Sequence, residues 1–475
     1  MLDNILLSTD SYKASHAKQY PEGTEYVYSY LESRGGKFDN TVFTGLQALI
    51  QEHLTGRVVT ASKIDEADEI ITAHMGAGNF NREGWEYILN EHNGVLPIQI
   101  KAVPEGTVVN TSNVLMTVVN TDPKCWWLTN YLESLLLHVW YPTTVATLSR
   151  ECKKLIAASL RETADHKNKA ELDASLDFKL HDFGFRGVSS LESASIGAAA
   201  HLLSFKGTDT LAAIPHISKY YGTSEMPGFS IPASEHSTIT SWGQENEIKA
   251  FENMLDLYPT GHVACVSDSY DISQATDVLW PALKDKIMAR DGVLIVRPDS
   301  GDIKMTLQVV LNNLWKHFGG HTTAEGYKVL HPSIRVIQGD GMNYESLKDL
   351  LQYLPRIGFS TENLAFGMGG ALLQKVDRDT QKFAFKCSSI NINGEWEGVQ
   401  KAPTEIDENG DKHASFKKSK RGRLALSKSR VAGQFATISL VGNSTYSDDQ
   451  LKLVFEDGVQ YRKISFQEAR KNAAL

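Results

Sequence analysis

The stretch VLIVRPDSGD, residues 293–302, joins a short apolar run to a polar loop. A helical pattern follows at once in KMTLQVVLNNLWKHF, residues 304–318, where apolar residues recur every three or four positions. An apolar strand, a polar loop and an amphipathic helix are the parts of a β–α unit. The stretch therefore predicts one unit of an α/β fold with a parallel sheet.

Six more stretches repeat this order of apolar run, polar loop and helical pattern. Their starts lie roughly 25 to 42 residues apart, which is the length of a strand, a crossover helix and two loops. An open doubly wound sheet and a closed barrel both fit. Polar residues follow every strand, which favours a barrel because its strand ends meet at one mouth. Ordinary polar turns are the alternative, but they explain the arginine and aspartate at strand ends less well. The six stretches are FKLHDFGFRG (178–187), LLSFKGTD (202–209), GFSIPASEHS (228–237), VACVSDSYD (263–271), RVIQGDGMN (335–343) and LAFGMGG (364–370).

The two ends of the chain differ from this middle part. Helical stretches such as TGLQALIQEHL (44–54) mix with strand-like runs such as PIQIKAV (97–103) and VLMTVVN (114–120). Near the C-terminus, QFATISLV (434–441) and LKLVFEDG (451–458) alternate as antiparallel strands do. The ends therefore predict a second, sheet-containing α+β domain. We divide the chain into residues 1–150 plus 386–475 for that domain and 176–385 for the barrel.

The composition is that of a globular protein, with 475 residues, 41% hydrophobic and 22% charged. A net charge of −9 argues against general nucleic-acid binding. No apolar run approaches the roughly 18 residues of a membrane span, and Asp3 stands where a signal peptide is positive. The cysteines form no C-x-x-C pair, which indicates reduced thiols in a cytoplasmic protein. They are Cys125, Cys152, Cys265 and Cys387.

Arg297 and Asp299 share the loop that follows the first stretch. The aspartate suits a metal or a sugar hydroxyl, and the arginine suits a phosphate or an aromatic ring. An Arg–Asp pair that only holds the loop is an equal alternative. The glycine-rich turns IQGDG (337–341) and FGMGG (366–370) can cradle a phosphate with backbone N–H groups, although glycine also serves plain turns. FGMGG lacks the spacing of a dinucleotide-binding loop, which disfavours a Rossmann fold.

Other motifs add an aromatic ring and more charge. HDFGFRG (181–187) combines Phe183, a flat ring, with Arg186, an anion partner, and FKGTD (205–209) ends in Asp209. KKSKRGR (417–423) has five cations, which form either a solvated face or a phosphate-binding segment. The set suits a ligand with several phosphates and a flat ring. No serine or cysteine nucleophile with a neighbouring base is evident.

His236 lies in FSIPASEHSTITSWG, residues 229–243. Pro232 ends a strand-like run, Ser234 is the predicted N-cap of a helix, and His236 falls in its first turn. The helix N-terminus disfavours a protonated imidazole. A neutral ring there could meet an anion or take up a phosphoryl group. An ordinary first-turn histidine is the alternative.

Nine motifs, in order along nearly the whole chain, resemble those of the nicotinamide phosphoribosyltransferases, which are members of the type II phosphoribosyltransferase family. They are TDSYKASH (9–16), HDFGFRGVSS (181–190), FKGTDT (205–210), IPASEHSTI (231–239), SDSYDI (267–272), RPDSG (297–301), VIQGDG (336–341), FGMGGALLQK (366–375) and RGRL (421–424).

The resemblance implies an irregular seven-stranded α/β barrel with a second sheet domain built from both chain ends. It implies a homodimer whose active sites are shared between subunits. The implied reaction converts nicotinamide and 5-phosphoribosyl 1-pyrophosphate to nicotinamide mononucleotide and pyrophosphate, with Mg²⁺, in NAD salvage. It also implies ATP as a co-substrate, hydrolysed through a phosphohistidine that matches His236.

The resemblance also implies the roles of single residues. The pyridine ring would stack between Phe183 and Tyr12 of the partner subunit, with Arg297 beside the ring and the phosphate. Arg186 would contact the pyrophosphate or product phosphate, and Asp268 and Asp299 would hold the ribose or the metal. The chemistry would depend on His236, Asp268, Arg297 and Asp299. Ser230, Ile231, Gly339, Asp340, Gly369 and Gly370 would line the substrate pocket, and Arg34, Arg378, Lys386, Lys401 and Lys417 would bind phosphates.

Asp209 predicts a preference for the amide. Its carboxylate can accept a hydrogen bond from a carboxamide and would repel the carboxylate of nicotinate. A nicotinate phosphoribosyltransferase, which would share the fold and the phosphohistidine, is the nearer alternative, and Asp209 and the TDSYKASH motif speak against it. A catalytically silent nicotinamide- or mononucleotide-binding regulator is another alternative, and the presence of His236, Arg297 and Asp299 speaks against that.

Overall fold

The computed structural model describes residues 3–165, 169–406, 412–414, 418–429 and 433–475. The chain divides into two compact units. Unit 1 comprises Met1–Thr147, Ser218–Gly222 and Asp377–Ala473, and unit 2 comprises Leu148–Ile217, Thr223–Val376 and Ala474–Leu475.

Unit 1 includes residues 218–222, which the division from sequence placed in the barrel. The carbonyl of Tyr220 accepts hydrogen bonds from the side chains of Gln47 and Gln51, both at 2.8 Å. The hydroxyl of Tyr221 donates to Glu105 at 3.2 Å. These buried polar contacts with distant residues explain why the short segment belongs to unit 1.

A seven-stranded antiparallel sheet forms the centre of unit 1. The predicted strands at 97–103 and 114–120 are confirmed as β3 and β5, and the strand at 451–458 as β20. Tyr30, Ile100 and Phe455 are fully buried in its core, and each stabilises the fold by about 1.5–3 kcal/mol. In sheet order the strands are β15 (Glu395–Gly398), β14 (Phe383–Ile392), β1 (Thr24–Ser33), β5 (Val114–Asn120), β3 (Ile98–Ala102), β20 (Lys452–Glu456) and β21 (Val459–Gln460).

Short strand pairs and helices complete unit 1. The pairs are β2 (Asn40–Val42) with β4 (Val108–Asn110), β16 (Thr404–Ile406) with β17 (Lys412–Ala414), and β18 (Arg423–Lys428) with β19 (Phe435–Leu440). The helices are η1 (Ile5–Leu7), η2 (Ser11–Lys18), α1 (Leu46–His53), α2 (Ala61–Met75), α3 (Arg82–Glu91), η3 (Pro123–Cys125), α4 (Leu128–Tyr131), α5 (Glu133–Leu137), η8 (Arg378–Thr380) and α18 (Phe466–Asn472). The unit boundaries fall within α6 (Trp140–Thr163) and α9 (Ala213–Tyr220).

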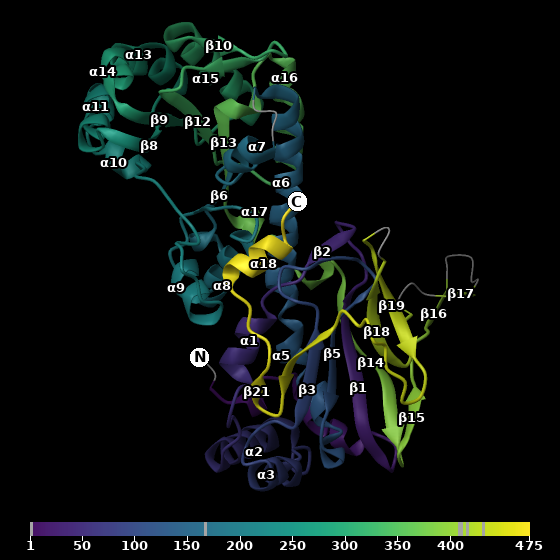
Figure 1. Cartoon of the computed structure of the whole chain (residues 1–475). Coiled ribbons are helices and arrows are strands. Elements are labelled where there is room, and N and C mark those ends of the chain that lie inside the picture. Colours follow the sequence, from purple (N-terminus) through teal and green to yellow (C-terminus); the bar gives the residue numbers. More distant parts are fainter. Residues whose placement is uncertain (1–2, 166–168, 407–411, 415–417, 430–432) are drawn as a thin grey trace. The chain divides into compact units, whose positions relative to one another are not determined.

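Unit 2 is built on a curled, fully parallel sheet of six strands. Five of the seven predicted apolar runs form its strands. In LLSFKGTD (202–209) the two-residue strand β7 comes after the apolar run, at Gly207–Thr208. Figure 1 shows helices α11, α14, α15 and α16 around the outside of this sheet. In sheet order the strands are β7 (Gly207–Thr208), β6 (Leu180–Asp182), β13 (Leu364–Met368), β12 (Ile334–Gln338), β9 (Asp291–Arg297) and β8 (Thr260–Val266).

The seventh run, around residues 229–233, forms only single bridges. Phe229 bridges Gly207 at the β7 edge, and Ala233 bridges Ala264 at the β8 edge, both in parallel. Pro232 has no N–H to extend a ladder, although its carbonyl accepts from the Ala264 N–H at 3.0 Å. The predicted strand is therefore reduced to one bridge at each edge of the sheet.

Helix α15 (Ile303–Phe318) confirms the helix predicted over 304–318. The Asp302 side chain caps its N-terminus by accepting from the Met305 N–H at 2.9 Å. Leu307, Leu311 and Leu314 face the core. The other helices of unit 2 are α7 (Lys169–Leu176), η4 (Phe185–Gly187), α8 (Leu191–His201), α10 (His236–Thr240), η5 (Gln244–Asn246), α11 (Glu247–Leu257), α12 (Ile272–Gln274), η6 (Ala275–Leu279), α13 (Trp280–Ala282), α14 (Lys284–Ala289), α16 (Tyr344–Arg356), η7 (Thr361–Asn363) and α17 (Gly370–Leu373), with a hairpin of β10 (Gly320–Thr322) and β11 (Lys328–Leu330).

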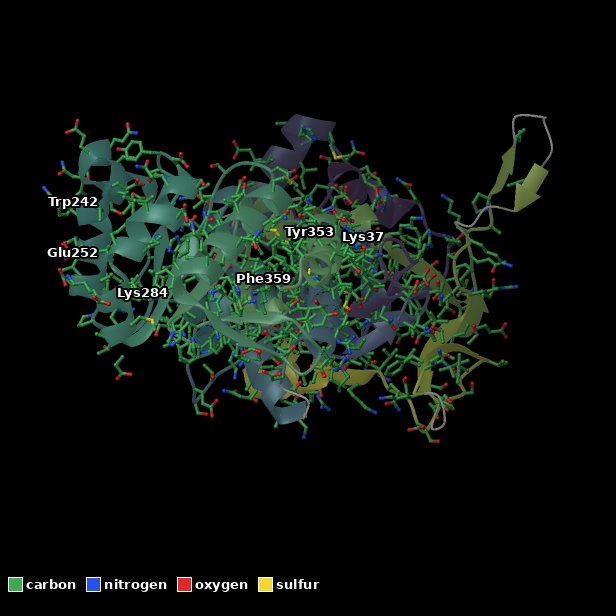
Figure 2. All side chains as sticks on the ribbon, turned by 90° about the horizontal axis from the view of Figure 1, so that it is seen from above. Lys37, Trp242, Glu252, Lys284, Tyr353 and Phe359 are labelled. Carbon is green, nitrogen blue, oxygen red and sulfur yellow. The ribbon has the colours of Figure 1, made fainter. Side chains whose placement is uncertain are left out.

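The interior and the surface of unit 2 are distinct. Phe359 is fully buried, whereas Trp242 is 40% exposed, and Figure 2 shows Trp242 at the periphery. Among the described residues, no helix is both long enough and apolar enough to cross a membrane.

Candidate active site

Most predicted site residues lie where the parallel strands of unit 2 end. Because neighbouring strands run in the same direction, their carboxyl ends share one edge of the sheet. At this edge lie Phe183 and Arg186 after β6, Asp209 after β7, Ser230, Ile231 and His236 in or after the bridging segment, Asp268 after β8, Arg297 and Asp299 at the end of β9, Gly339 and Asp340 after β12, and Gly369 and Gly370 after β13.

His236 meets two aspartates. Its Nε2 lies 3.8 Å from Asp268 Oδ1 and 3.6 Å from Asp299 Oδ2, and its Nδ1 lies 3.2 Å from the Ser269 hydroxyl. The imidazole is 47% exposed, whereas the Asp268 side chain is almost fully buried. A solvent-accessible imidazole therefore lies close to two carboxylates that follow neighbouring strands.

The predicted N-cap at Ser234 is wrong. Helix α10 begins at His236 and its N-cap is Glu235. The buried Ser234 hydroxyl instead accepts from the Val266 N–H at 2.9 Å and contacts the Cys265 sulfur at 3.5 Å. Since α10 has five residues, its dipole is a weaker influence on the ring than the sequence suggested.

Asp268 holds the loop after β9. Its Oδ2 accepts hydrogen bonds from the Asp299 N–H at 3.0 Å and from the Ser300 hydroxyl. Its Oδ1 is buried and has no hydrogen-bond partner among the described residues. One oxygen therefore shapes the loop, and the other remains available to a cation or to a protonated His236.

Arg297 and Asp299 form a loose pair. Arg297 Nη2 lies 3.7 Å from Asp299 Oδ2, beyond hydrogen-bonding distance. Arg297 Nε is buried without a hydrogen-bond partner in the described part of the chain. Of the two readings of this motif, a pair that only holds the loop accounts less well for the unused guanidinium donor.

A buried carboxylate that the sequence analysis did not single out, Asp182, joins the loops that carry Phe183 and Asp209. Its oxygens accept from the Gly184 N–H at 2.7 Å and the Thr208 hydroxyl at 2.9 Å, and its carbonyl accepts from the Asp209 N–H at 2.9 Å. Burial raises the pKa of Asp182. The motif HDFGFRG contained this aspartate, but only the fold shows that its side chain points inward.

Asp209 is exposed, and its side chain pairs with Ser230. The Ser230 hydroxyl donates to Asp209 Oδ1 at 2.5 Å. The buried side-chain amide of Gln338 donates to the Asp340 carbonyl at 2.9 Å and so orders the turn after β12. Arg186 is exposed and Ile231 is half-buried at the same edge.

Carboxylate oxygens near His236 fit a divalent metal. Glu247, at the start of α11, is 4% exposed, and its Oε1 has no hydrogen-bond partner among the described residues. Burial, with Asp268 and Asp271 nearby, raises the pKa of Glu247 to about 7. Mg²⁺ takes oxygen ligands, usually one or two carboxylates with substrate phosphates. The unpartnered oxygen of Asp268 and the carboxylate of Asp299 meet that requirement.

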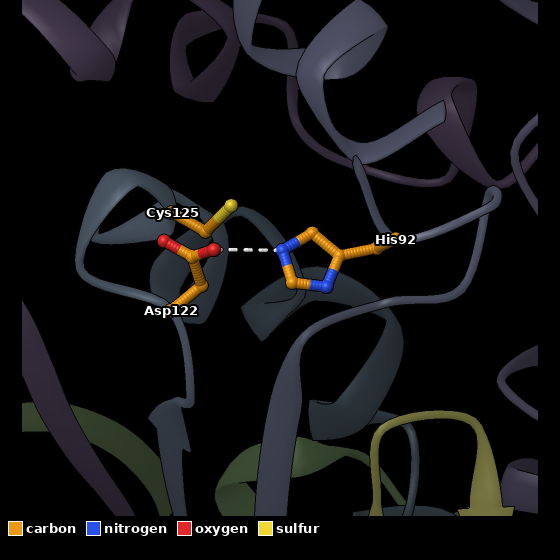
Figure 3. Close-up of side chains that lie close together, drawn as sticks. All are labelled: His92, Asp122 and Cys125. Atoms are coloured by element: carbon orange, nitrogen blue, oxygen red, sulfur yellow. Dashed lines mark hydrogen bonds and ion pairs between the residues drawn. The ribbon is translucent and has the colours of Figure 1, made fainter. Parts of the chain in front are cut away.

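Three potential metal ligands also meet in unit 1, as Figure 3 shows. His92 Nε2 lies 2.7 Å from Asp122 Oδ2, which also accepts from the Tyr87 hydroxyl at 3.0 Å, while Oδ1 accepts from the Lys124 N–H at 2.7 Å. Burial, with Asp122 nearby, raises the pKa of the Cys125 thiol to about 12, which disfavours the thiolate that binds metals. We therefore interpret the cluster as a structural His–Asp pair between α3 and η3.

Three of the predicted phosphate-binding cations gather in unit 1. Arg34 Nε pairs with Glu32 at 3.0 Å, while its Nη2 is buried without a hydrogen-bond partner in the described part of the chain. Burial lowers the pKa of Lys386 most, the Glu133 carboxylate opposes this, and the positive charges of Arg34, Lys13 and Lys401 lower it further. A partly buried cluster of positive charge suits an anion.

Tyr12 and Arg378 are the other predicted residues of unit 1 that the structure describes. Tyr12 is 57% exposed in η2, while its neighbour Lys13 is buried and pairs with Glu133 at 2.6 Å. Arg378 is exposed and pairs with Asp379 at 3.0 Å. Lys417 lies outside the described residues.

The fold and the comparisons with known proteins define an enzyme class, the phosphoribosyltransferases. Residues 178–459 match the family model of the "Nicotinate phosphoribosyltransferase (NAPRTase) family", and residues 4–100 match "Nicotinamide phosphoribosyltransferase, N-terminal domain". The chain belongs to the nicotinate phosphoribosyltransferase (NAPRTase) family.

Several curated relatives and solved structures are similar to this chain. A "Nicotinamide phosphoribosyltransferase" of Xanthomonas campestris pv. campestris is 48% identical over 99% of this chain and 98% of its own length. One of Acinetobacter baylyi is 33% identical over 99% and 97%. The structure of human nicotinic acid phosphoribosyltransferase has a TM-score of 0.57 at 15% identity, covering 98% of this chain and 92% of its own. A nicotinate-nucleotide pyrophosphorylase from Pyrococcus furiosus has a TM-score of 0.60 at 14% identity, covering 100% and 95%.

Proposed function

We propose that this protein is a nicotinamide phosphoribosyltransferase of NAD salvage, acting in the cytoplasm. It converts nicotinamide and 5-phosphoribosyl 1-pyrophosphate to nicotinamide mononucleotide and pyrophosphate. The observation that carries the proposal is the full-length similarity, at 48% identity, to a relative with that name. Asp209, exposed at the strand ends, adds a chemical reason for an amide substrate.

The reaction asks for positioning and charge neutralisation rather than for a base. The pyridine nitrogen of nicotinamide is already a nucleophile, and the barrier lies in breaking the bond between ribose C1 and pyrophosphate. Phe183 stacks on the ring, and Arg297 neutralises charge through its unused donor. Asp268 and Asp299 would hold Mg²⁺, which would neutralise charge on the leaving pyrophosphate.

Asp209 selects the amide over the acid in this proposal. Because Ser230 donates to Oδ1, Oδ2 is left to accept from the carboxamide NH₂. The carboxylate of nicotinate would bring a second negative charge to this place, and two like charges about 4 Å apart near a protein surface repel each other by a few kcal/mol.

ATP acts through His236. A ring nitrogen attacks the γ-phosphorus, the bond to the β–γ bridging oxygen breaks, and ADP leaves. Water later cleaves the phosphorus–nitrogen bond and releases phosphate. The exposure of the imidazole supports access for ATP. A metal ion bound to Asp268 and Asp299 would reduce the repulsion between these carboxylates and the phosphohistidine dianion.

The segment 229–233 acts as the seventh strand and closes the sheet of unit 2 into an irregular barrel. Its parallel bridges to Gly207 and Ala264, at opposite edges of the sheet, support this closure. Two subunits form a homodimer in which Tyr12 of the partner subunit completes each site. The cations Arg34, Arg378, Lys386, Lys401 and Lys417 bind substrate phosphates.

Nicotinate transfer is the second candidate, because the family model that covers residues 178–459 bears that name. Purified protein with 5-phosphoribosyl 1-pyrophosphate and Mg²⁺ is offered nicotinamide or nicotinate, each with and without ATP. Formation of nicotinamide mononucleotide, increased by ATP, is the expected result. Preferred turnover of nicotinate would establish the second candidate, and binding without turnover would indicate a silent regulator.

A further inference from the structure

A glycine inside strand β13, Gly367, faces the ring of Phe183. A Cβ built on Gly367 would lie 2.1 Å from Phe183 Cε2, 2.3 Å from Cδ2 and 3.0 Å from Cζ. Distances below 3.0 Å do not occur between real Cβ atoms and their neighbours, so any side chain here must displace the ring.

The backbone gives no other reason for glycine at this position. Gly367 pairs with His181 in the regular parallel register of β13 and β6 and does not have a left-handed φ. A glycine inside a strand weakens it and often marks a place where another group approaches closely. The approaching group here is the aromatic ring.

A second glycine, Gly339, lies beside the same ring and directly follows the neighbouring strand. The register pairs Gln338, the last residue of β12, with Phe366, so Gly339 comes next to Gly367 of β13. A Cβ on Gly339 would lie 3.3 Å from Phe183 Cε2, a tight contact that a small shift relieves. Both glycines lie against the Phe183 ring, and Gly367 is the one that tolerates no added atom.

Hydrogen bonds to other residues, not contacts with these two glycines, hold the main chain of Phe183. Its N–H donates to the Met368 carbonyl at 3.0 Å, and the Asp182 carboxylate accepts from the next N–H, that of Gly184, at 2.7 Å. Because the backbone is fixed on both sides, a methyl group at Gly367 would change the direction of the ring more than the path of the chain.

We infer that Gly367 is a positioning residue for nicotinamide. Because Gly367 has no side chain, the Phe183 ring can lie against β13, and the opposite face of the ring is then free to stack on the pyridine ring. The inference rests on the proposed function. It assigns a part in nicotinamide binding to a glycine inside a strand. The glycines at the start of α17, Gly369 and Gly370, are predicted to hold phosphate instead.

The first test is Gly367→Ala, assayed with nicotinamide and 5-phosphoribosyl 1-pyrophosphate varied separately. Displacement of a stacking ring by about 1 Å is expected to raise the KM for nicotinamide roughly tenfold to a hundredfold. The KM for 5-phosphoribosyl 1-pyrophosphate should change by less than about twofold. Phe366→Leu is the matched control, because Phe366 is fully buried in the same strand and alternates to the other face. It should lower the melting temperature without changing the KM for nicotinamide.

A double-mutant cycle separates ring positioning from general damage. In a Phe183→Ala background there is no ring to displace, so adding Gly367→Ala should change the KM for nicotinamide by less than about twofold. Additive effects of the two substitutions would overturn the inference, and so would a normal KM in Gly367→Ala.

Folding gives a second readout if Gly367→Ala is insoluble. The double variant Phe183→Ala/Gly367→Ala should then recover soluble protein, because the clashing ring is gone. Failure to recover would overturn the inference. A wild-type protein that transfers no phosphoribosyl group to nicotinamide would instead contradict the proposed function, and the recovery of folding would still decide whether the ring occupies this seat.

Discussion

At the scale of single residues, Asp209 and Ser230 act as one unit in the proposed choice of substrate. The serine hydroxyl occupies one carboxylate oxygen and fixes the direction of the other. The negative charge discriminates against an acid, while the hydrogen bond orients that charge. The two contributions can be separated, because Ser230 carries no charge of its own.

We expect Asp209→Asn to relax the discrimination against nicotinate. Removing the charge removes a like-charge repulsion of a few kcal/mol, so the ratio of kcat/KM for nicotinamide to that for nicotinate should fall roughly tenfold or more. A competition assay with both substrates measures the ratio. Ser230→Ala is the control and should weaken nicotinamide binding with the ratio largely kept. An unchanged ratio in Asp209→Asn would remove the assigned role.

His236→Ala is expected to abolish ATP hydrolysis and the stimulation of transfer by ATP. Slow basal transfer should persist, because positioning of the pyridine ring and neutralisation of pyrophosphate depend on other residues. Release of phosphate from γ-labelled ATP and formation of the mononucleotide are measured in parallel. Ser237→Ala, at the next exposed position, should keep both activities. Continued ATP turnover in His236→Ala would refute the phosphohistidine.

The sequence predicted that these candidate residues follow strands, but it did not predict their supporting contacts. A polar residue after an apolar run predicts a strand end, and that much holds for Arg297, Asp299 and Asp268. The inward direction of Asp182 and the close approach of Phe183 to Gly367 depend on sheet register and side-chain rotamers. The pattern of residues along the chain shows neither the sheet register nor the rotamers.

At the scale of secondary-structure elements, helix α8 carries a buried histidine against the sheet of unit 2. The His201 Nδ1 lies 2.9 Å from the Ser149 hydroxyl, and its ring stacks on Phe205 at 5.3 Å. Burial lowers the pKa of His201 from 6.5 to about 3. The folded protein therefore holds this ring neutral at a pH where the unfolded chain would protonate it.

This shift predicts a loss of stability in acid. Because the folded pKa lies below the unfolded pKa, the contribution of His201 is complete above pH 6.5 and is lost as the pH falls toward 3, up to about 5 kcal/mol over that range. His201→Gln should therefore flatten the dependence of the unfolding free energy on pH between 7 and 4. Urea unfolding at several pH values measures the slope. His262→Gln, at an exposed position, should leave it as in the wild type, and an equal slope in His201→Gln would refute the assignment.

Strand prediction was most successful where apolar runs were long and lacked proline. Strands β9, β12 and β13 formed as expected, while the run around Pro232 kept one bridge at each edge. The missing N–H of proline is visible in the sequence. Its consequence for the ladder depends on which edges of the sheet the segment meets.

At the scale of the whole molecule, the chain ends contribute one antiparallel sheet and the middle contributes one parallel sheet. The change from period-two to mixed strand–helix patterning made this division readable in sequence. The inclusion of residues 218–222 in unit 1 was not readable, because it depends on buried hydrogen bonds to Gln47, Gln51 and Glu105.

A shared active site predicts that two inactive subunits can complement each other. Tyr12→Ala removes the residue that one subunit would lend to its partner, and Asp299→Asn removes a residue that each subunit would keep for its own parallel sheet. In a mixed dimer, one site then has both defects and the other has neither. After equal amounts of the two variants are unfolded together and refolded, about half of the dimers are mixed, and activity should return to about a quarter of wild type.

The same mixture tells apart the two possible places of Tyr12. If Tyr12 served the site of its own chain, every site in a mixed dimer would carry one defect, and refolding would restore no activity. Each variant refolded alone is the control and should stay near its own low rate, while size-exclusion chromatography follows the dimer. Because the exposed Tyr12 projects from η2 beside the buried Lys13–Glu133 pair, its substitution removes a surface ring and leaves the anchoring contact in place. A loss of activity in Tyr12→Ala that no partner can repair would therefore argue against a shared site.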